Sequence, residues 1–193
     1  QLPADTSALL QSIGDSLSAA EQLLSGLLDI SKLDAGALPV HRQTFAADSL
    51  LAPLAREFEV LAAQRGLSFR YRPTRALLHS DAALLRRVFQ NFLGNALRYT
   101  RQGRVLLGVR RAGRYLRIEV WDTGPGIAPE QQGLIFEEFR RLQAQDIVGE
   151  RGLGLGLAIS ERIARLLGHP LSLRSWPGQG SVFALTVPLG AAE

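Results

Sequence analysis

Two asparagines in one predicted helix are the first residues whose spacing points to chemistry. Asn91 and Asn95 are four residues apart in NFLGNALRYT, so their amides project from one helical face, which Arg98 shares. Asparagine is a poor helix former, so two of them in an apolar helix need a reason. Amide oxygens suit Mg²⁺, which prefers oxygen ligands and shares its shell with substrate phosphates. A buried amide pair bonded to the backbone explains the pattern equally well.

The segment DTGPGI, at the end of a predicted strand, offers a second group of candidate residues. Asp122 can accept a hydrogen bond from an exocyclic amine, and Gly124 and Gly126 would let a flat ring approach the backbone. Taken alone, the segment is more often a plain turn, because aspartate and glycine dominate turns for local reasons.

A third group lies in IFEEFRR, where two aromatic residues precede an arginine pair. Phe136 and Phe139 are three residues apart and could pin a mobile segment to the body of the domain. Arg140 or Arg141 could then meet a phosphate. The alternative, in which both phenylalanines are ordinary core residues, is at least as good.

The fourth group is the alternating glycine run GERGLGLGLAI. Gly152, Gly154 and Gly156 lead into a predicted helix, and bare amides at a helix start form a site for anions. The glycines also permit a hinge beside a lid. The run is not a P-loop, because no GxxxxGK[ST] occurs, and its context does not fit a dinucleotide fingerprint.

The composition bounds the class of protein that carries these residues. The chain has 193 residues, of which 46% are hydrophobic and 21% charged, as in a soluble globular protein with one ample core. No apolar run approaches the roughly 18 residues of a membrane helix, and no signal peptide is visible. The chain starts at Gln1, and we expect it to be a piece of a longer protein. There is no cysteine, and the net charge of +4 is a weak pointer to phosphate or nucleic acid.

The first element expected to support these groups is a long helix over residues 7–36. Its apolar residues step by three and four, as in a heptad seam that must pack in a bundle or on a second copy. An amphipathic helix lying on the core is the alternative. The seam residues are Leu10, Ile13, Leu17, Ala20, Leu24 and Leu27, widened by Leu9, Leu23 and Ile30.

The rest of the chain reads as helices interleaved with antiparallel hairpins, which indicates an α+β sandwich with helices on one face of a mixed sheet. Asp48 and Asp81 are expected to cap two of the helices. The expected elements are a strand at 41–47, a helix at 49–65, strands at 67–72 and 76–80, a helix from 82 to about 100, a hairpin of strands 104–111 and 115–121, a helical turn near 129–139, a helix at 154–168, and a hairpin of strands 170–176 and 181–187.

The four groups, in this order along the chain, resemble the series found in the ATP-binding domain of sensor histidine kinases. The likeness extends over nearly the whole chain, since LDISKLDAG at 28–36 is similar to the end of the second helix of that family's dimerisation hairpin. The resemblance implies a dimerisation helix at 1–38 and, at 39–193, a catalytic domain of the Bergerat (HATPase_c, GHKL) fold, a two-layer α/β sandwich.

The resemblance also assigns roles to residues. Asp122 would accept a hydrogen bond from the adenine amine, and Asn91 and Asn95 would hold Mg²⁺ and the phosphates. Arg98 stands where the family usually has lysine, which keeps the charge but changes the geometry of the contact. Residues 140–153 would form a lid. The implied ATP-binding residues are Tyr99, Asp122, Gly124, Gly126, Ile127, Phe136, Arg140, Gly152, Leu153, Gly154, Leu155 and Gly156, and the implied catalytic residues are Asn91, Asn95 and Arg98.

In this family the γ-phosphoryl group of ATP passes to a histidine on the first dimerisation helix, and then to an aspartate of a response-regulator receiver domain. Here the phosphoacceptor motif is absent, because His41, His79 and His169 lie in the wrong contexts. The chain is therefore expected to bind Mg²⁺-ATP without phosphorylating itself at the usual site. The resemblance further implies a cytoplasmic location and a homodimer formed through residues 7–36 in the full-length protein.

Three other functions compete with this interpretation. A chaperone, gyrase or mismatch-repair ATPase would use a glutamate base where this chain has Asn91, and an amide cannot act as a general base. A degenerate kinase that only signals is left open by Arg98 and by the missing acceptor. Nucleic-acid binding through RYRPTR at 70–75 and through Arg110 and Arg111 rests on a weak basic pattern, and we expect none.

Overall fold

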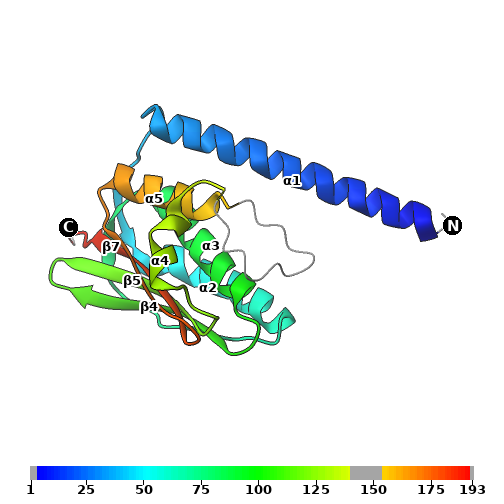
Figure 1. Cartoon of the computed structure of the whole chain (residues 1–193). Helices are drawn as coiled ribbons and strands as arrows, with labels where there is room; N and C mark the ends of the chain where they lie inside the picture. The colour runs from blue at the N-terminus through cyan, green and yellow to red at the C-terminus, as the bar shows by residue number, and fades with distance from the viewer. Residues whose placement is uncertain (1–3, 140–153, 192–193) are drawn as a thin grey trace.

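The heptad-patterned segment at the N-terminus forms a single long helix, α1 (Ala4–Asp34), close to the predicted range of 7–36. The structure is a computed structural model that describes residues 4–139 and 154–191. The C-terminal half of α1 lies along the rest of the molecule, and its N-terminal half extends beyond it (Figure 1). Within the described ranges, no helix has the length and apolarity needed to span a bilayer.

The strands form a mixed sheet, as predicted. Its five strands run in the order β2-β4-β5-β7-β6, with β2 and β4 parallel and the other neighbours antiparallel. The bounds are β2 (Ser68–Tyr71), β4 (Arg104–Ala112), β5 (Tyr115–Asp122), β6 (Leu171–Trp176) and β7 (Gly180–Pro188). Two further strands, β1 (Gln43–Ala46) and β3 (Leu77–Ser80), pair with each other in a separate antiparallel sheet.

The helices cover one face of the five-stranded sheet (Figure 1), so the predicted α+β sandwich is confirmed. The main helices are α2 (Ala47–Gln64), α3 (Ala82–Tyr99) and α5 (Gly156–Leu167), and the short ones are α4 (Pro129–Gln132) and η1 (Leu134–Phe136). The core lies between the two layers. Phe92 of α3, which is fully buried, meets Phe183 of β7 with ring centroids 5.3 Å apart.

Of the two predicted helix caps, one is confirmed and one is wrong. Asp81 caps α3, because its carboxylate accepts hydrogen bonds of 3.0 Å from the amides of Ala83 and Leu84. Asp48 instead lies inside the first turn of α2, where it accepts hydrogen bonds from the Tyr71 hydroxyl and the Thr74 amide. Burial and this neighbouring carboxylate raise the pKa of Tyr71 above its ordinary value. Asp48 therefore bonds Tyr71 and Thr74, which are distant in the sequence, and not the amides at the start of its own helix.

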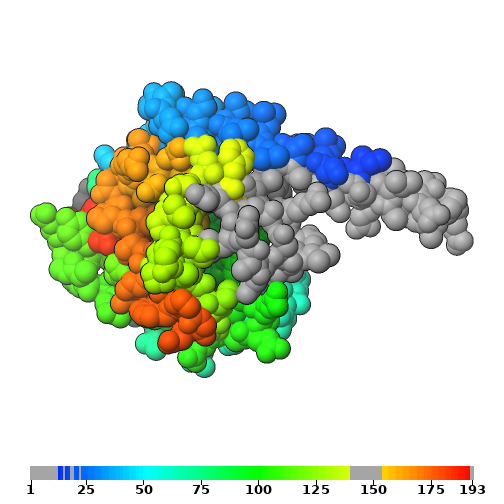
Figure 2. Space-filling model, in the orientation of Figure 1, coloured from blue at the N-terminus to red at the C-terminus, as the bar shows by residue number. Residues whose placement is uncertain are grey.

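The C-terminal half of α1 packs directly against α5, where the two surfaces touch in Figure 2. Ile30 is buried at this contact, and Gly26 lies so close to Leu155 that a β-carbon would come within 2.8 Å of the leucine Cδ1 atom. Much of the predicted seam stays open, since Leu17 and Leu24 are each 62% exposed. Both interpretations of the helix therefore hold in part: one face lies on the core, and the heptad seam has no cover in the described chain.

Two ion pairs join α1 to the helices beneath it. Asp29 pairs with Arg87 of α3, and Asp34 accepts a 2.8 Å hydrogen bond from Arg162 of α5. Arg162 also reaches Glu138, just after η1, at 2.5 Å. These contacts fix the end of α1 over the helical layer that carries the candidate site.

Candidate functional site

Asp122 is the last residue of β5. By strand alternation it faces the same side as the core residues Ile118 and Val120. Burial raises the pKa of its carboxyl group above the ordinary value, although hydrogen bonds from the backbone amides of Gly124 and Ser181 oppose this in part. The Gly124 bond is 2.8 Å long. A half-buried carboxylate whose desolvation outweighs its two backbone hydrogen bonds is costly to keep ionised. Such a cost is typical of a group that serves a ligand.

A second polar group lies beside this carboxylate. The hydroxyl oxygen of Thr100 is buried and has no hydrogen-bond partner among the described residues. A β-carbon on Gly124 would stand 2.9 Å from Asp122 Oδ1 and 3.3 Å from Thr100 Oγ1. Gly124 thus leaves open the space between two under-satisfied polar groups. Sequence reasoning missed Thr100, whose one signal was its place directly after Tyr99 in the asparagine helix.

Gly126 was also expected beside the ligand, but the fold itself requires glycine at this position. Its φ angle is +69°, and a β-carbon there would lie 2.0 Å from the carbonyl oxygen of Trp176. The next residue, Ile127, is half-buried against the core, and its amide donates a 2.7 Å bond to the Ser175 hydroxyl. The turn after Asp122 is therefore held against the β6–β7 hairpin.

Asn91 connects α3 to the start of α5. Its amide nitrogen donates to the Gly156 carbonyl oxygen at 2.9 Å and to the Ser160 hydroxyl at 3.0 Å, which uses both of its protons. Its Oδ1 atom accepts no hydrogen bond from the described residues and faces the open side of Gly156, 3.3 Å from a β-carbon placed there. The amide thus makes a structural bond through its nitrogen and leaves its oxygen without a partner among the described residues.

The other polar residues of the asparagine helix follow Asn91 towards its C-terminal end. Asn95, one turn later, is half-buried, and its amide has no hydrogen-bond partner in the described part of the chain. Helical periodicity places it on the face of Asn91. Arg98 is half-buried in the last turn, and Tyr99 is 40% exposed beside Thr100. Among the described residues, no three His, Cys, Asp or Glu side chains cluster as metal ligands.

The glycine run enters α5 later than predicted, because the helix begins at Gly156 and not at Gly154. Gly154 has a φ angle of +71°, which only glycine adopts readily, and it turns the chain into the helix. Leu155 occupies the N-cap position and is buried. Its apolar side chain makes no capping hydrogen bond to the first-turn amides. The first-turn amides are therefore open to an anion. The expected residues Arg140, Gly152 and Leu153 and the expected lid at 140–153 lie outside the described residues.

The predicted aromatic anchor is right for one residue and wrong for the other. Phe136 is half-buried and packs on the core, whereas Phe139 is 53% exposed with a φ angle of +59°. Phe139 leaves the core because the chain turns outward there. An open depression of about 300 Å³ lies between this segment and α5, lined by Phe136, Glu137, Glu138, Glu161, Arg162 and Arg165. It contains neither Asp122 nor Asn91, so we place the candidate site at those two residues.

Known proteins share this arrangement. Sensor histidine kinase RcsC of Escherichia coli is 30% identical over 100% of this chain and 21% of its own length. The aerobic respiration control sensor protein ArcB of Escherichia coli is 32% identical over 97% of this chain and 25% of its own. The chain thus spans about a quarter or less of these relatives. The crystal structure of full-length ShkA in complex with AMPPNP matches 100% of this chain and 40% of ShkA, with 28% identity and a TM-score of 0.84.

A family signature agrees with these likenesses. The signature of the histidine kinase-, DNA gyrase B- and HSP90-like ATPases matches residues 80–191, which include every site residue described above. Because this match covers more than half of the sequence, the chain belongs to the histidine kinase-, DNA gyrase B- and HSP90-like ATPase family.

Proposed function

We propose that this chain is the catalytic ATP-binding part of a sensor histidine kinase, which binds Mg²⁺-ATP and donates its γ-phosphoryl group to a histidine. The observation that carries the proposal is the half-buried Asp122 carboxylate, with a raised pKa, next to the unsatisfied hydroxyl of Thr100. Family membership supports ATP as the ligand. The name of RcsC, a sensor histidine kinase, supports a kinase over the other activities of the family.

In this proposal Asp122 and Thr100 recognise adenine. The carboxylate accepts a hydrogen bond from the exocyclic amine, and the Thr100 hydroxyl bonds a neighbouring ring nitrogen. Gly124 leaves room for the edge of the ring, because no side chain projects between these two groups. Tyr99 and Ile127 flank the ring, and Gly126 holds the turn in place. A ligand that satisfies a half-buried carboxylate and a buried hydroxyl together gains specificity from both.

The phosphates lie between α3 and the start of α5 in this proposal. Asn91 Oδ1 and Asn95 supply amide oxygens for Mg²⁺, and Arg98 supplies positive charge. The backbone amides of the glycine run, Gly152 to Gly156, bind the phosphate oxygens. ATP supplies the γ-phosphoryl group when bound. The protein's part is positioning and neutralisation of charge, which suffices for phosphoryl transfer.

The acceptor histidine lies outside this chain in our proposal. His169 is buried with its Nε2 atom 2.7 Å from the Ser80 hydroxyl, and the exposed His79 lies on β3 with its Nδ1 atom 3.2 Å from the Thr44 hydroxyl. Neither suits an acceptor that must meet the γ-phosphate. The third histidine, His41, lies exposed in the segment between α1 and β1, outside any helix. The chain alone would then not phosphorylate itself. The phosphoryl group would pass onward to an aspartate of a response-regulator receiver domain.

Residues 1–38 form the dimerisation part and residues 39–193 the catalytic part in this proposal. The exposed seam of α1, which includes Leu17 and Leu24, would pair with a second copy in the full-length protein. The catalytic part would act in the cytoplasm, where ATP is available.

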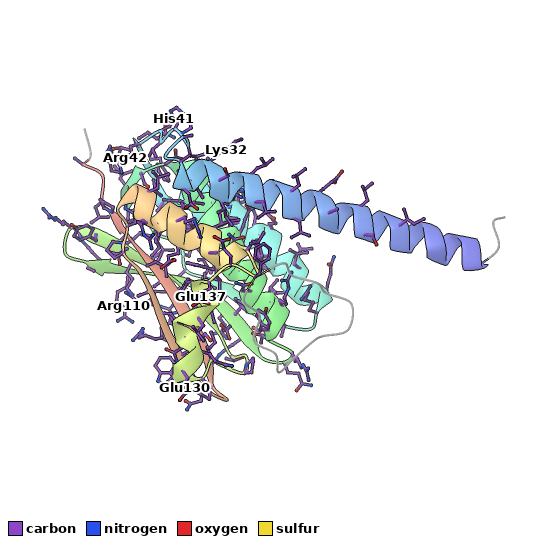
Figure 3. The ribbon with its side chains drawn as sticks, turned by 45° about the horizontal axis from the view of Figure 1, so that its top comes forward. Lys32, His41, Arg42, Arg110, Glu130 and Glu137 are labelled. Carbon is purple, nitrogen blue, oxygen red and sulfur yellow. The ribbon has the colours of Figure 1, made fainter. Side chains whose placement is uncertain are left out.

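Isothermal titration calorimetry with ATP, with and without Mg²⁺, tests the proposal. We expect Mg²⁺-assisted binding to the parent and none to Asp122→Asn. Glu130→Gln is the matched control, because it makes the same carboxylate-to-amide change on an exposed residue of α4 (Figure 3). Equal affinity of the parent and Asp122→Asn would overturn the assignment. Transfer of labelled phosphate to a separate dimerisation domain that carries the acceptor histidine would then establish the kinase reaction.

A further inference from the structure

The strands of the main sheet direct their arginines away from the helices. Residues such as Leu107 and Ile118 face the helical layer and are fully buried, so the residues between them face the other way. No described helix covers this outward face (Figure 1). The charged residues of the five strands at outward positions are Arg70, Arg104, Arg110, Arg117, Glu119 and Arg174.

This outward face is strongly positive. Five arginines and one glutamate lie at the outward positions of the five strands, so these positions together have a formal net charge of +4. In Figure 3, Arg110 lies on this strand side, away from Lys32 on α1. A one-sided positive field attracts and orients anionic partners.

The single acid on the face serves to fix its neighbours. Glu119 is only 5% exposed, and it accepts hydrogen bonds from Arg117 Nε at 2.7 Å and from Trp121 Nε1 at 2.9 Å. Burial alone would raise the pKa of Glu119, but the bonds from Arg117 and Trp121 outweigh it and hold the pKa below its ordinary value. Arg117 also donates to the Ser172 hydroxyl at 2.9 Å. Its guanidinium group is thus held in one place.

Arg174 is held by aromatic rings. Its guanidinium carbon lies 5.6 Å from the ring centroid of Trp121 and 5.9 Å from that of Trp176. Beneath this layer, Val182 and Ala184 of β7 also face outward, yet both are buried although they do not belong to the main core. The arginine and tryptophan side chains therefore form a fixed second layer on the sheet.

One pairing in this layer costs stability. Arg110 and Arg117 are directly opposite each other on β4 and β5, and like charges at such positions are destabilising. Glu119 pairs with Arg117 and also attracts Arg110, which is exposed and makes no ion pair or hydrogen bond with the described residues. The guanidinium group of Arg110 is therefore available to a partner that supplies negative charge.

We propose that this outward sheet face, built from Arg70, Arg104, Arg110, Arg117, Arg174 and the two tryptophans, docks an acidic surface of a partner protein. Guanidinium groups match carboxylates in fork geometry, and groups fixed beforehand lose less entropy on binding. One face of each tryptophan ring already contacts Arg174, which leaves less ring surface for the base stacking of nucleic-acid readout. The face measures about 20 by 25 Å, which suits a small and transient protein interface.

Intrinsic fluorescence gives a direct test, because Trp121 and Trp176 are the two tryptophans of the chain and both lie on this face. The nucleotide-free protein is titrated with poly-L-glutamate as the probe. We expect a saturable change in fluorescence that weakens as salt is raised. Arg110→Glu should weaken binding about tenfold, because it reverses an exposed charge of this face. Arg56→Glu is the matched control, since Arg56 is exposed on α2, in the layer on the other face of the sheet.

The proposal fails if Arg56→Glu weakens binding as much as Arg110→Glu, because the effect would then follow net charge alone. It also fails if the fluorescence does not change, or if a single-stranded oligonucleotide or phosphatidylserine vesicles bind this face more tightly than polyglutamate. Both variants must have a melting temperature no lower than the parent's and must keep its affinity for AMPPNP. That control separates this proposal from the proposed nucleotide site. If the protein did not bind nucleotide at all, the fluorescence titration would still test the docking of an acidic partner.

Discussion

Asn91 and Gly156 lie 65 residues apart in the sequence and are joined by a 2.9 Å hydrogen bond from the asparagine amide nitrogen to the glycine carbonyl oxygen. This bond ties α3 to the first residue of α5 and leaves Asn91 Oδ1 facing the open side of Gly156. The same side chain therefore fixes the helix start and presents an oxygen beside it. The structural role and the proposed ligand role of Asn91 can be separated by comparison with Asn95. The amide of Asn95 makes no hydrogen bond with the described residues.

Asn91→Ala and Asn95→Ala should differ in stability but not in binding. Asn91→Ala removes two hydrogen bonds to α5 and should lower the free energy of unfolding by about 1–2 kcal/mol. Asn95→Ala should leave it unchanged or slightly higher, since alanine is the better helix former. Both should lose the Mg²⁺-dependent part of the AMPPNP affinity. Urea unfolding without nucleotide and calorimetric titration measure the two effects, and Mg²⁺-dependent binding that survives in both variants would contradict the cation role.

Features set by neighbouring residues were predictable from the sequence. The cap of α3 by Asp81 and the bounds of β4 and β5 follow from local capping and alternation, and the structure confirms them to within about a residue. Asp48 was misread as a cap because its partner, Tyr71, lies 23 residues away. A tertiary bond of this kind leaves no local trace.

The site shows the same division between local and tertiary information. Asp122, Asn91 and the glycines could be found as residue types in a pattern, but the unsatisfied hydroxyl of Thr100 depends on what surrounds it in the fold. The contact that requires glycine at 126 comes from the carbonyl of Trp176, 50 residues later in the chain. The outward arginine face likewise could not be predicted from alternation within single strands. It depends on how the five strands are ordered and aligned in the sheet.

Asp122→Asn should abolish nucleotide binding while leaving the free protein at least as stable at neutral pH. Burial raises the folded-state pKa of this carboxyl group, so the ionised form is the disfavoured one in the fold. The contribution of the Asp122 carboxyl group to stability is greatest below the unfolded-state pKa of about 3.9, where the group is protonated. This contribution is lost as pH rises through the raised folded-state pKa. Urea midpoints of the parent and variant from pH 4 to 7 measure this. A variant that is less stable at pH 7 would show that the ionised carboxylate supports the fold.

His169 should make the fold sensitive to mild acid. Burial lowers its pKa, a backbone hydrogen bond at Gly168 opposes this in part, and the charge of Arg42 adds a smaller lowering. The neutral ring therefore stabilises the fold above the unfolded-state pKa of about 6.5, and this stability is lost as pH falls from there through the lowered folded-state value. His169→Gln should flatten the pH dependence of the urea midpoint below pH 7. His79→Gln, on an exposed residue, is the control and should keep the parent's slope.

The contact of Gly26 with Leu155 predicts that α1 and the start of α5 respond together to one substitution. A β-carbon at 26 would stand 2.8 Å from Leu155 Cδ1, so Gly26→Val must push that leucine or lift α1 from the helical layer. We expect a loss of about 1–3 kcal/mol in the free energy of unfolding, as for other overpacked contacts.

Gly14→Ala is the matched control for this prediction, because nothing lies within 4 Å of its added carbon and alanine favours the helix. It should be neutral or stabilising by up to about 1 kcal/mol. Because Leu155 directly precedes the open amides of α5, Gly26→Val should also weaken AMPPNP binding, whereas Gly14→Ala should not. Thermal unfolding and calorimetric titration of both variants measure this. Unchanged affinity in a destabilised Gly26→Val protein would show that α1 packs on the domain without influencing the phosphate end of the site.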